Sequence, residues 1–597
     1  MMNLTPRPPS LIRSLRITGK GEKERRSLAM SSPDTFAALT GNGERVGDWK
    51  GENQCENGHA SPASASCGDN ALDHSSPPSL AMRSERLGKG AGGLGLLTML
   101  SGCKALQNGK KELTGTSAPT FAPASSHADA EAARRTLNRV AFGPNPGEVA
   151  RVADMGIGAY IEEQLADSLP ESRAVSWRVD GLETQQDILD APDTLDALPD
   201  SQLLTETQQA ALLRAVYSTH QLRETLADFW TNHFNIFALK NDERVLLPTD
   251  AECALRPHIS GKFRDLLNAS AHSPAMLSYL DNHLNKRGVA NENYGRELLE
   301  LHTLGVHSGY TQKDIQEVAR CFTGWRVRKG FVKLNLANLK TPYNGFEFGA
   351  FQHDNGLKYI PFLNLMIAPN GGQKDGEAVL ERLATHPATA RFLATKLSKK
   401  YLGHAPDAVV EKAANAYLKS DTDIRALLRP ILLDNLPKAG TTKPILKRPL
   451  EFTVSALRTL GADTNGGADL QQHLSAMGQA LYQWPMPDGF PEKPSAWSGS
   501  LLGRWNFAMA LTANGVGGAT VDLPAIGKAF GANSDSARLD ALIETIYQIP
   551  AVSPELAGLR QTVSQHIAKA KTSNLAENSI FAEAAGLLLA APAFQMT

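Results

Sequence analysis

The sequence has few cysteines: 5 in 597 residues, with no CxxC pair among them. A disulfide framework or a cysteine-rich zinc site is therefore disfavoured. The chain also lacks net charge, because 61 Lys and Arg residues balance 62 Asp and Glu residues and leave a formal charge of −1. A neutral chain gives no support for nucleic acid as the main partner, so we expect none. No apolar run is long enough for a membrane-spanning helix.

Common catalytic motifs are missing as well. The sequence contains no GxSxG elbow, no HExxH, no P-loop and no GxGxxG opening a βαβ unit. The usual readings as a serine hydrolase, a zinc protease or a nucleotide-binding enzyme therefore lose support. The length and the 42% hydrophobic content are nevertheless sufficient for a large core.

The N-terminal part resembles a leader more than a domain. Residues 1–81 are rich in Ser, Pro, Gly and charge, a composition that buries too little apolar surface to fold. Residues 82–102 then have the order of a secretory signal peptide. Three basic side chains are followed by the apolar run 91–100. We therefore predict that translation begins at Met82 and that residues 1–81 are a non-native or disordered extension.

The signal ends in Leu-Ser-Gly-Cys, with the cysteine at Cys103. This box resembles that of bacterial lipoproteins, which implies cleavage before Cys103 and lipidation of its thiol. Several acyl chains anchor a protein stably in a membrane. We expect an exported, lipid-anchored envelope protein that faces the periplasm or the cell surface. Residues 103–128 would form a flexible tether. Cys253 and Cys321 would remain in the mature chain, and their spacing does not determine whether they pair.

Residues 129–597 predict a mainly α, multi-helix globular body, because apolar residues recur at helical spacing. Thr311 to Asp314 resembles a capping box, and His386-Pro387 predicts another helix start, with Arg391 and Lys396 on its exposed side. Residues 326–362 alternate apolar and polar positions, which predicts a small β-hairpin insertion. Asn355-Gly356 suits its turn.

Several stretches, in order from about residue 130 to 595, resemble one bacterial family, the domain of unknown function 1800. They are RRTLNRVAFGPNPGEVARVADMGIGAYIEEQL, DFWTNHFNIF, FRDLLNASAHSPAMLSYLDN, NENYGRELLELHTLGVHSGYTQKDIQEVARCFTGW, QHDNGLK, THPATARFLATKL and MGQALYQWPMPDGFP with RWNFA. The resemblance implies a helical, exported protein and a functional link to an exported sulfatase-like protein. It implies no known reaction. Gly295 stands where the family more often has alanine, which predicts a less regular turn, since glycine costs a helix about 1 kcal/mol.

Residues 291–306, NENYGRELLELHTLGV, carry the densest set of reactive side chains. At 100° per residue, Glu297 and Glu300 share one stripe of a helix, whereas His302 lies on the far side. Two carboxylates held together favour a shared proton, cation or metal ion. The stripe is therefore a candidate metal or acid–base site, or else a solvated or ion-paired face. Glu292 and Arg296 stand at i,i+4 in the favourable order and are expected to pair.

Other candidates come from outside this stretch. His353 and Asp354 are placed at the tip of the predicted hairpin, where they suit a divalent metal or a general base, or only a turn. His233 in DFWTNHFNIF lies among aromatic residues and is more typical of a core histidine than of a ligand. The proline-rich loop WPMPDGFPEKPSAW suits a binding rim or a rigid wrap over the core.

Two hypotheses follow. In the first, the protein binds, exports or scaffolds a partner without catalysis, and the sulfatase-like protein implied by the resemblance is the candidate partner. In the second, it is a metal-assisted hydrolase of a cell-surface polymer. The catalytic residues of that hydrolase would be Glu297, Glu300 and Asp354, and its divalent metal would be held by His233, Glu297, Glu300 and His353.

Overall fold

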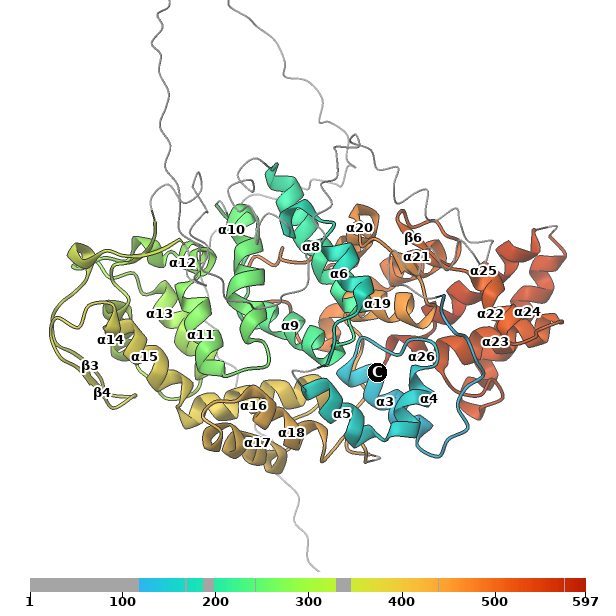
Figure 1. Cartoon of the computed structure of the whole chain (residues 1–597), viewed down its shortest axis with the longest axis horizontal. Coiled ribbons are helices and arrows are strands. Elements are labelled where there is room, and N and C mark those ends of the chain that lie inside the picture. The colour runs from blue at the N-terminus through green and yellow to red at the C-terminus, as the bar shows by residue number, and fades with distance from the viewer. Residues whose placement is uncertain are drawn as a thin grey trace, which may run out of the picture. The chain divides into compact units, whose positions relative to one another are not determined.

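The computed structural model describes residues 118–597 except 167–168, 186–197, 242, 329–344, 439 and 574. All of these belong to the compact unit formed by residues 88–597. The predicted extension 1–81, the signal 82–102 and Cys103 lie outside the described residues. Helices dominate the described part, which confirms the mainly α prediction (Figure 1). None of them is long and apolar enough to cross a membrane.

The first part of the unit, up to residue 321, is a succession of short helices. They are α3 (Ala130–Val140), α4 (Glu148–Met155), α5 (Ile157–Leu165), α6 (Arg173–Val179), α8 (Asp200–Tyr217), α9 (Gln221–His233), α10 (Glu243–Thr249), η2 (Asp250–Leu255), η3 (Arg256–His258), α11 (Phe263–His272), α12 (Pro274–Tyr279), η4 (Asn282–Leu284), α13 (Asn293–Glu297), η5 (Leu298–Thr303) and α14 (Gln312–Cys321).

Helices resume beyond residue 373. They are α15 (Lys374–Ala384), α16 (Pro387–Leu402), α17 (Asp407–Lys419), α18 (Ile424–Leu432), α19 (Pro449–Thr459), α20 (Ala468–Ala476), η8 (Pro494–Ser500), α21 (Leu501–Thr512), α22 (Leu523–Ala529), α23 (Asp535–Tyr547), η9 (Pro554–Leu556), α24 (Ala557–Lys571), α25 (Glu577–Ala590) and α26 (Pro592–Gln595).

Two helix starts follow directly from the sequence. Thr311 accepts a hydrogen bond from the backbone N–H of Asp314, and the Asp314 carboxylate accepts one from the N–H of Thr311, so the predicted capping box is confirmed. His386 caps α16 through Nδ1, which accepts from the N–H of Ala388 at 3.1 Å. Both caps satisfy backbone donors that the first helical turn leaves unpaired.

The β structure consists of short antiparallel pairs. β1 (Trp325–Val327) pairs with β2 (Phe346–Phe348), β3 (Lys358–Ile360) with β4 (Leu365–Ile367), and β5 (Asp463–Thr464) with β6 (Ala519–Thr520). Between β2 and β3 lies the 3-10 turn η7 (Ala350–Gln352). The sequence expectation for Asn355-Gly356 is wrong, because this dipeptide precedes β3 and does not join two paired strands.

The core consists of two large clusters of buried apolar side chains. One extends from α3 to α18, and the other joins α19 to α26. α8 contributes to both, through Leu203 to the first and Leu212 to the second. Phe121, in the stretch predicted to be tether, is buried in the second cluster. The end of the predicted tether therefore packs against the body.

Two segments, η2 and η5, are π-helical. A π-helix inserts an extra residue into a helical turn and is often found at functional sites. η5 follows Glu297 directly, so the residues after it do not keep the 100° phase assumed from sequence. The turn before it is tightly packed, since a Cβ added to Gly295 would lie 3.3 Å from the backbone nitrogen of Ala319.

Candidate functional site

The acidic stripe at α13 and η5 contains the predicted ion pair. Arg296 Nη2 lies 3.3 Å from Glu292 Oε2, and Arg296 Nη1 lies 3.5 Å from Glu300 Oε1. The amide oxygen of Gln312 accepts a further hydrogen bond from Arg296 at 2.9 Å. Arg296 therefore pairs with Glu292, as the i,i+4 spacing predicts, and its single positive charge also offsets part of the charge of Glu300.

Glu297 is the carboxylate that this network leaves out. No described residue forms a hydrogen bond or an ion pair with it. Burial first, then the charges of Glu300 and of Asp488 from the proline-rich loop, raise the pKa of Glu297, and Arg296 opposes them only in part. Burial and Glu300 likewise raise the pKa of Tyr310 to about 12. Glu297 is thus a carboxyl group that resists ionisation, as general acids do.

His233, at the C-terminal end of α9, is buried among aromatic rings. Its Nε2 lies 3.0 Å from the carbonyl oxygen of His302, and its Nδ1 lies 3.2 Å from Lys396 Nζ. Nε2 must donate to the carbonyl, so Nδ1 accepts from the ammonium group and the imidazole is neutral. Burial and Lys396 hold the pKa of His233 well below its usual value. His233 is therefore a core histidine, the more typical interpretation from sequence.

Lys396 corrects the expected exposed face of α16. Its side chain is mostly covered, packs over Phe229 and Phe392, and lies 3.7 Å from Glu492 of the proline-rich loop. Burial lowers the pKa of Lys396. Helical periodicity placed Lys396 with Arg391 on the solvent side, but a loop from almost a hundred residues further along the chain closes over it.

His353 is fully buried and does not project from a hairpin tip, contrary to the expectation from sequence. Its Nδ1 lies 2.7 Å from the Thr323 carbonyl oxygen, and its Nε2 lies 3.0 Å from Asp375 Oδ2. Asp375 also accepts from the buried Lys358 ammonium at 2.7 Å. This triplet of buried polar groups ties the loop before β3 to α15.

Asp354, the neighbour of His353, is engaged in a surface ion pair. Arg320 Nε donates to Asp354 Oδ2 at 2.9 Å, and this hydrogen bond lowers the pKa of Asp354 to about 2. A carboxylate held ionised by arginine is a poor proton acceptor at neutral pH.

The structure does not bring the four predicted metal ligands into one site. His233 and His353 each use both ring nitrogens within the protein, and Glu300 pairs with Arg296. Across the described ranges, no group of three His, Cys, Asp or Glu side chains is arranged to hold a metal ion. The two remaining cysteines, Cys253 and Cys321, are free thiols. Metal binding by this chain stays a prediction.

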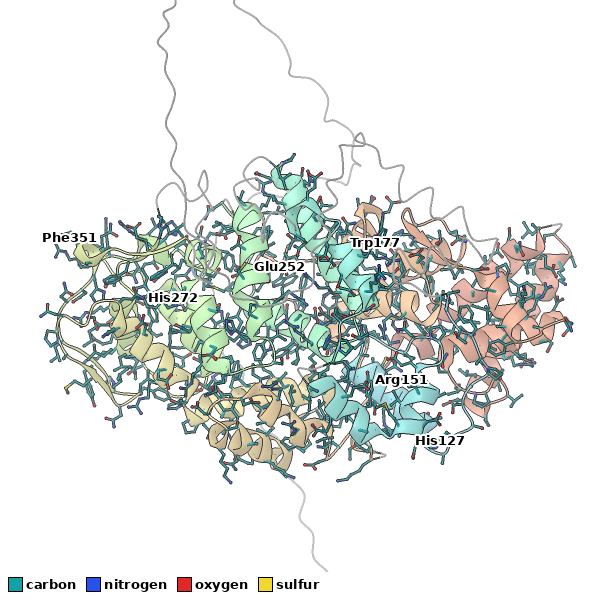
Figure 2. All side chains as sticks on the ribbon, viewed as in Figure 1. His127, Arg151, Trp177, Glu252, His272 and Phe351 are labelled. Atoms are coloured by element: carbon teal, nitrogen blue, oxygen red, sulfur yellow. The ribbon has the colours of Figure 1, made fainter. Side chains whose placement is uncertain are left out.

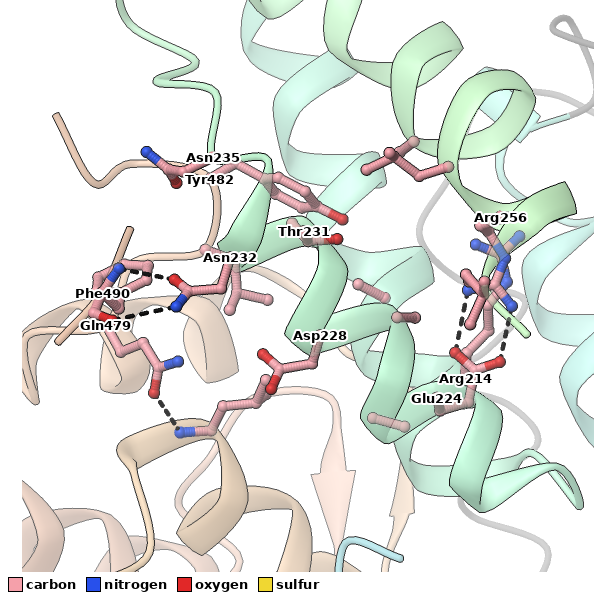
Figure 3. A pocket seen from close by; sticks show the side chains of 18 of the residues that line it. Arg214, Glu224, Asp228, Thr231, Asn232, Asn235, Arg256, Gln479, Tyr482 and Phe490 are labelled. Carbon is pink, nitrogen blue, oxygen red and sulfur yellow. Dashed lines mark hydrogen bonds and ion pairs between the residues drawn. The ribbon is translucent and has the colours of Figure 1, made fainter. Parts of the chain in front are cut away.

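The opposite side of α9 borders a cavity of about 70 Å³ (Figure 3). Its walls come from α8, α9, η2 and the segment 479–490. The buried Glu224 pairs with the partly covered Arg256 at 2.7 Å on one wall, and Arg214 pairs with Glu252 at 2.5 Å beside it. Asp228 lies one turn after Glu224 on α9, and Figure 3 shows its carboxylate on the side of the picture where Gln479 lies, away from these ion pairs.

The proline-rich loop forms part of this wall. Asn232 holds it by two hydrogen bonds, donating to the Phe490 carbonyl at 3.1 Å and accepting from the Phe490 N–H at 2.7 Å. Asn235 donates to the carbonyls of Trp484 and Met486. The loop is therefore a wrap held by α9 and the residues after it, and it also borders the cavity.

Sequence reasoning did not find the cavity. The stretch DFWTNHFNIF was of interest only for His233, and one part of the wall, the segment 479–490, lies about 250 residues further along the chain. The one signal in the sequence was polar spacing: Asp228, Thr231 and Asn232 recur at i, i+3 and i+4 on one face of the helix.

Fold and site together define a helical protein with a partly open cavity that polar and apolar groups line, and with an acidic surface stripe. Residues 135–596 match the family model described as "Protein of unknown function (DUF1800)". The chain therefore belongs to this family, and the resemblance seen in sequence is confirmed. No curated protein and no solved structure matched the chain.

Proposed function

We propose that this protein is an exported, lipid-anchored envelope protein that binds or scaffolds another exported protein. The lipoprotein-type box ending at Cys103 supports the anchor. The partner proposed from the family resemblance is an exported sulfatase-like protein.

The observation that carries the binding role is an exposed apolar face on the β3–β4 pair. Tyr359 and Met366 are cross-strand partners whose side chains point outward, and Leu357 precedes them on the same face. Met366 is 67% exposed. Nearby in the chain, Phe351 is 91% exposed and lies at the same end of the unit (Figure 2). Clustered exposed apolar side chains mark interaction surfaces more often than isolated ones.

The experiment for the binding role is a pull-down from envelope extracts with the full chain. Met366→Asp is expected to reduce recovery of the partner, because a charge at the centre of an apolar contact must be desolvated. Val552→Asp is the matched control, since Val552 is also apolar and exposed but lies in another part of the sequence. Equal recovery of the partner with both variants would contradict the proposal.

The anchor has a separate test. Replacing Cys103→Ser is expected to move the protein from the membrane fraction to the soluble envelope fraction, because the acylated thiol is lost. Metabolic lipid labelling should disappear in the same variant. Unchanged labelling would rule out Cys103 as the lipidation site.

A second candidate, the metal-assisted hydrolase of a cell-surface polymer, is favoured by one observation. Glu297 has no hydrogen-bond or ion-pair partner for its carboxylate among the described residues, has a raised pKa and directly precedes a π-helix. If Glu297→Gln abolishes the function of the protein in the cell but leaves recovery of the partner unchanged, the result would favour catalysis. If the variant loses both its cellular function and its partner, the result would favour the binding role. Metal analysis of the purified protein tests the metal separately.

A further inference from the structure

The cavity beside α9 contains polar groups that the protein itself does not satisfy. Gln479 is only 1% exposed, and its amide oxygen accepts from the Leu450 N–H at 2.9 Å. Its amide nitrogen has no acceptor among the described residues. The hydroxyls of Thr231 and Tyr482, which also line the cavity, have no hydrogen-bond partner within the same part of the chain. The Gln479 side chain is buried, whereas Thr231 and Tyr482 are half-buried at the cavity wall. Polar groups that face a cavity without protein partners are available to a ligand or to ordered water.

The charged groups of the cavity are compensated. Asp228 contacts Arg448 and Lys400 through Oδ2, which leaves Oδ1 as a free acceptor. Within each of the Glu224–Arg256 and Glu252–Arg214 pairs, the negative carboxylate and the positive guanidinium group cancel in charge. A charged ligand would meet no uncompensated partner and would lose its hydration, so the site suits a neutral molecule.

The free groups are of mixed kind: a donor at Gln479, an acceptor at Asp228, and the hydroxyls of Thr231 and Tyr482, which can do either. An alcohol group both donates and accepts, so neighbouring hydroxyls on one small molecule meet this set. The ring of Phe490 and several alanines complete the wall and suit the C–H faces of such a molecule.

The volume of the cavity limits the size of the ligand. The cavity, about 70 Å³, exceeds the ~10–15 Å³ that one water molecule needs but is smaller than the ~150 Å³ cavity that holds benzene. We propose that this cavity is a binding site for a small, neutral polyol of about three carbons. The proposal does not depend on the partner or on the anchor.

Saturation-transfer NMR of the full chain with glycerol tests the proposal. We expect a saturable signal that 1-propanol and acetate do not displace, because one lacks neighbouring hydroxyls and the other is charged. A signal that does not saturate, or that either competitor removes as well as glycerol does, would overturn the polyol assignment.

Variants place the binding in this cavity. Thr231→Val removes a hydroxyl that bonds to none of the residues the structure describes, so this part of the fold loses no hydrogen bond. Gln479→Glu keeps the acceptor for Leu450 and removes the free donor. Each is expected to weaken glycerol binding at least tenfold. Thr562→Val, at an exposed threonine of α24, is the matched control and should bind as wild type. Equal binding by Thr231→Val and Thr562→Val would overturn the site even if Gln479→Glu fails to fold.

Discussion

The two sides of α9 use polar residues in opposite ways. On one side His233 is enclosed by aromatic rings and has a protein partner for each ring nitrogen. On the other side Asp228 and Thr231 face a cavity where polar atoms remain without partners. Both sides belong to one helix of 13 residues.

The two sides of α9 distinguish polar groups that stabilise the fold from polar groups that are available to a ligand. A buried polar group that the protein satisfies contributes to stability and specificity of packing, whereas one that it leaves free is kept at a cost to stability. The chemically reactive histidine thus belongs to the core, and the less reactive amide and hydroxyls mark the site.

The largest expected effect comes from the cavity wall itself. Glu224→Gln should destabilise the protein by about 3–5 kcal/mol, because it leaves Arg256, whose side chain is mostly covered, without its closest carboxylate. Urea denaturation at pH 7 measures the change. Glu131→Gln, which breaks an exposed pair with Arg134, is the control and should cost less than about 1 kcal/mol. Equal losses would mean that the charged wall contributes no more than a surface pair.

The second largest effect is expected from acid, which should lower the stability of the fold through the buried histidines on the aromatic side of α9. Burial lowers the folded-state pKa of His233 well below 6.5 and that of His302 to about 3. Their stability contribution is complete above the unfolded pKa near 6.5 and is lost as pH falls below it, at up to about 1.4 kcal/mol per pH unit for each histidine.

Urea denaturation at pH 7.5 and pH 5.5 measures this loss. A His233→Gln, His302→Gln double variant should show a shallower pH dependence than wild type, because glutamine does not titrate. Parallel pH profiles for the two proteins would contradict the neutral buried imidazoles.

A pair of threonines on α9 compares the two sides directly. Thr225 is buried and its hydroxyl is bonded to the Val140 and Leu222 carbonyls and the Tyr401 hydroxyl, whereas the Thr231 hydroxyl has no partner in the described part of the chain. Thr225→Val should cost about 1–2 kcal/mol, and Thr231→Val should be close to neutral. Thermal denaturation of both variants measures the difference. A larger loss for Thr231→Val would show that its hydroxyl is already satisfied in the ligand-free protein.

The smallest effect is expected at the acidic stripe. Because the folded state raises the pKa of Glu297, its ionisation destabilises the fold as pH rises above the unfolded value. Glu297→Gln should therefore be neutral or stabilising by less than about 1 kcal/mol at pH 7, since the group is partly solvated. Glu292→Gln, which breaks the pair with Arg296, should be neutral or destabilising. Destabilisation by Glu297→Gln would show that the carboxylate has a partner.

Local rules predicted much of the fold. The Thr311 capping box, the His386 cap and the Glu292–Arg296 pair all depend on residues within four positions of one another, and all are present. The helical body follows from apolar periodicity in the same way. Each of these sequence patterns lies entirely within one short segment of the chain.

Features that depend on distant segments were missed. His353 is buried because Asp375 and Lys358 come to it, and Lys396 is covered because Glu492 folds over α16. The π-helical turn η5 breaks the phase on which a helical wheel depends. The spacing of residues in the sequence does not predict these features, because contacts between distant segments determine them.

The most direct test of the contrast across α9 is a crystal structure of the protein purified without added polyols. We predict ordered water or ligand oxygen atoms within hydrogen-bonding distance of the Gln479 amide nitrogen, Asp228 Oδ1 and the Thr231 hydroxyl. A cavity filled by protein side chains, with these three groups bonded to protein atoms, would contradict the account.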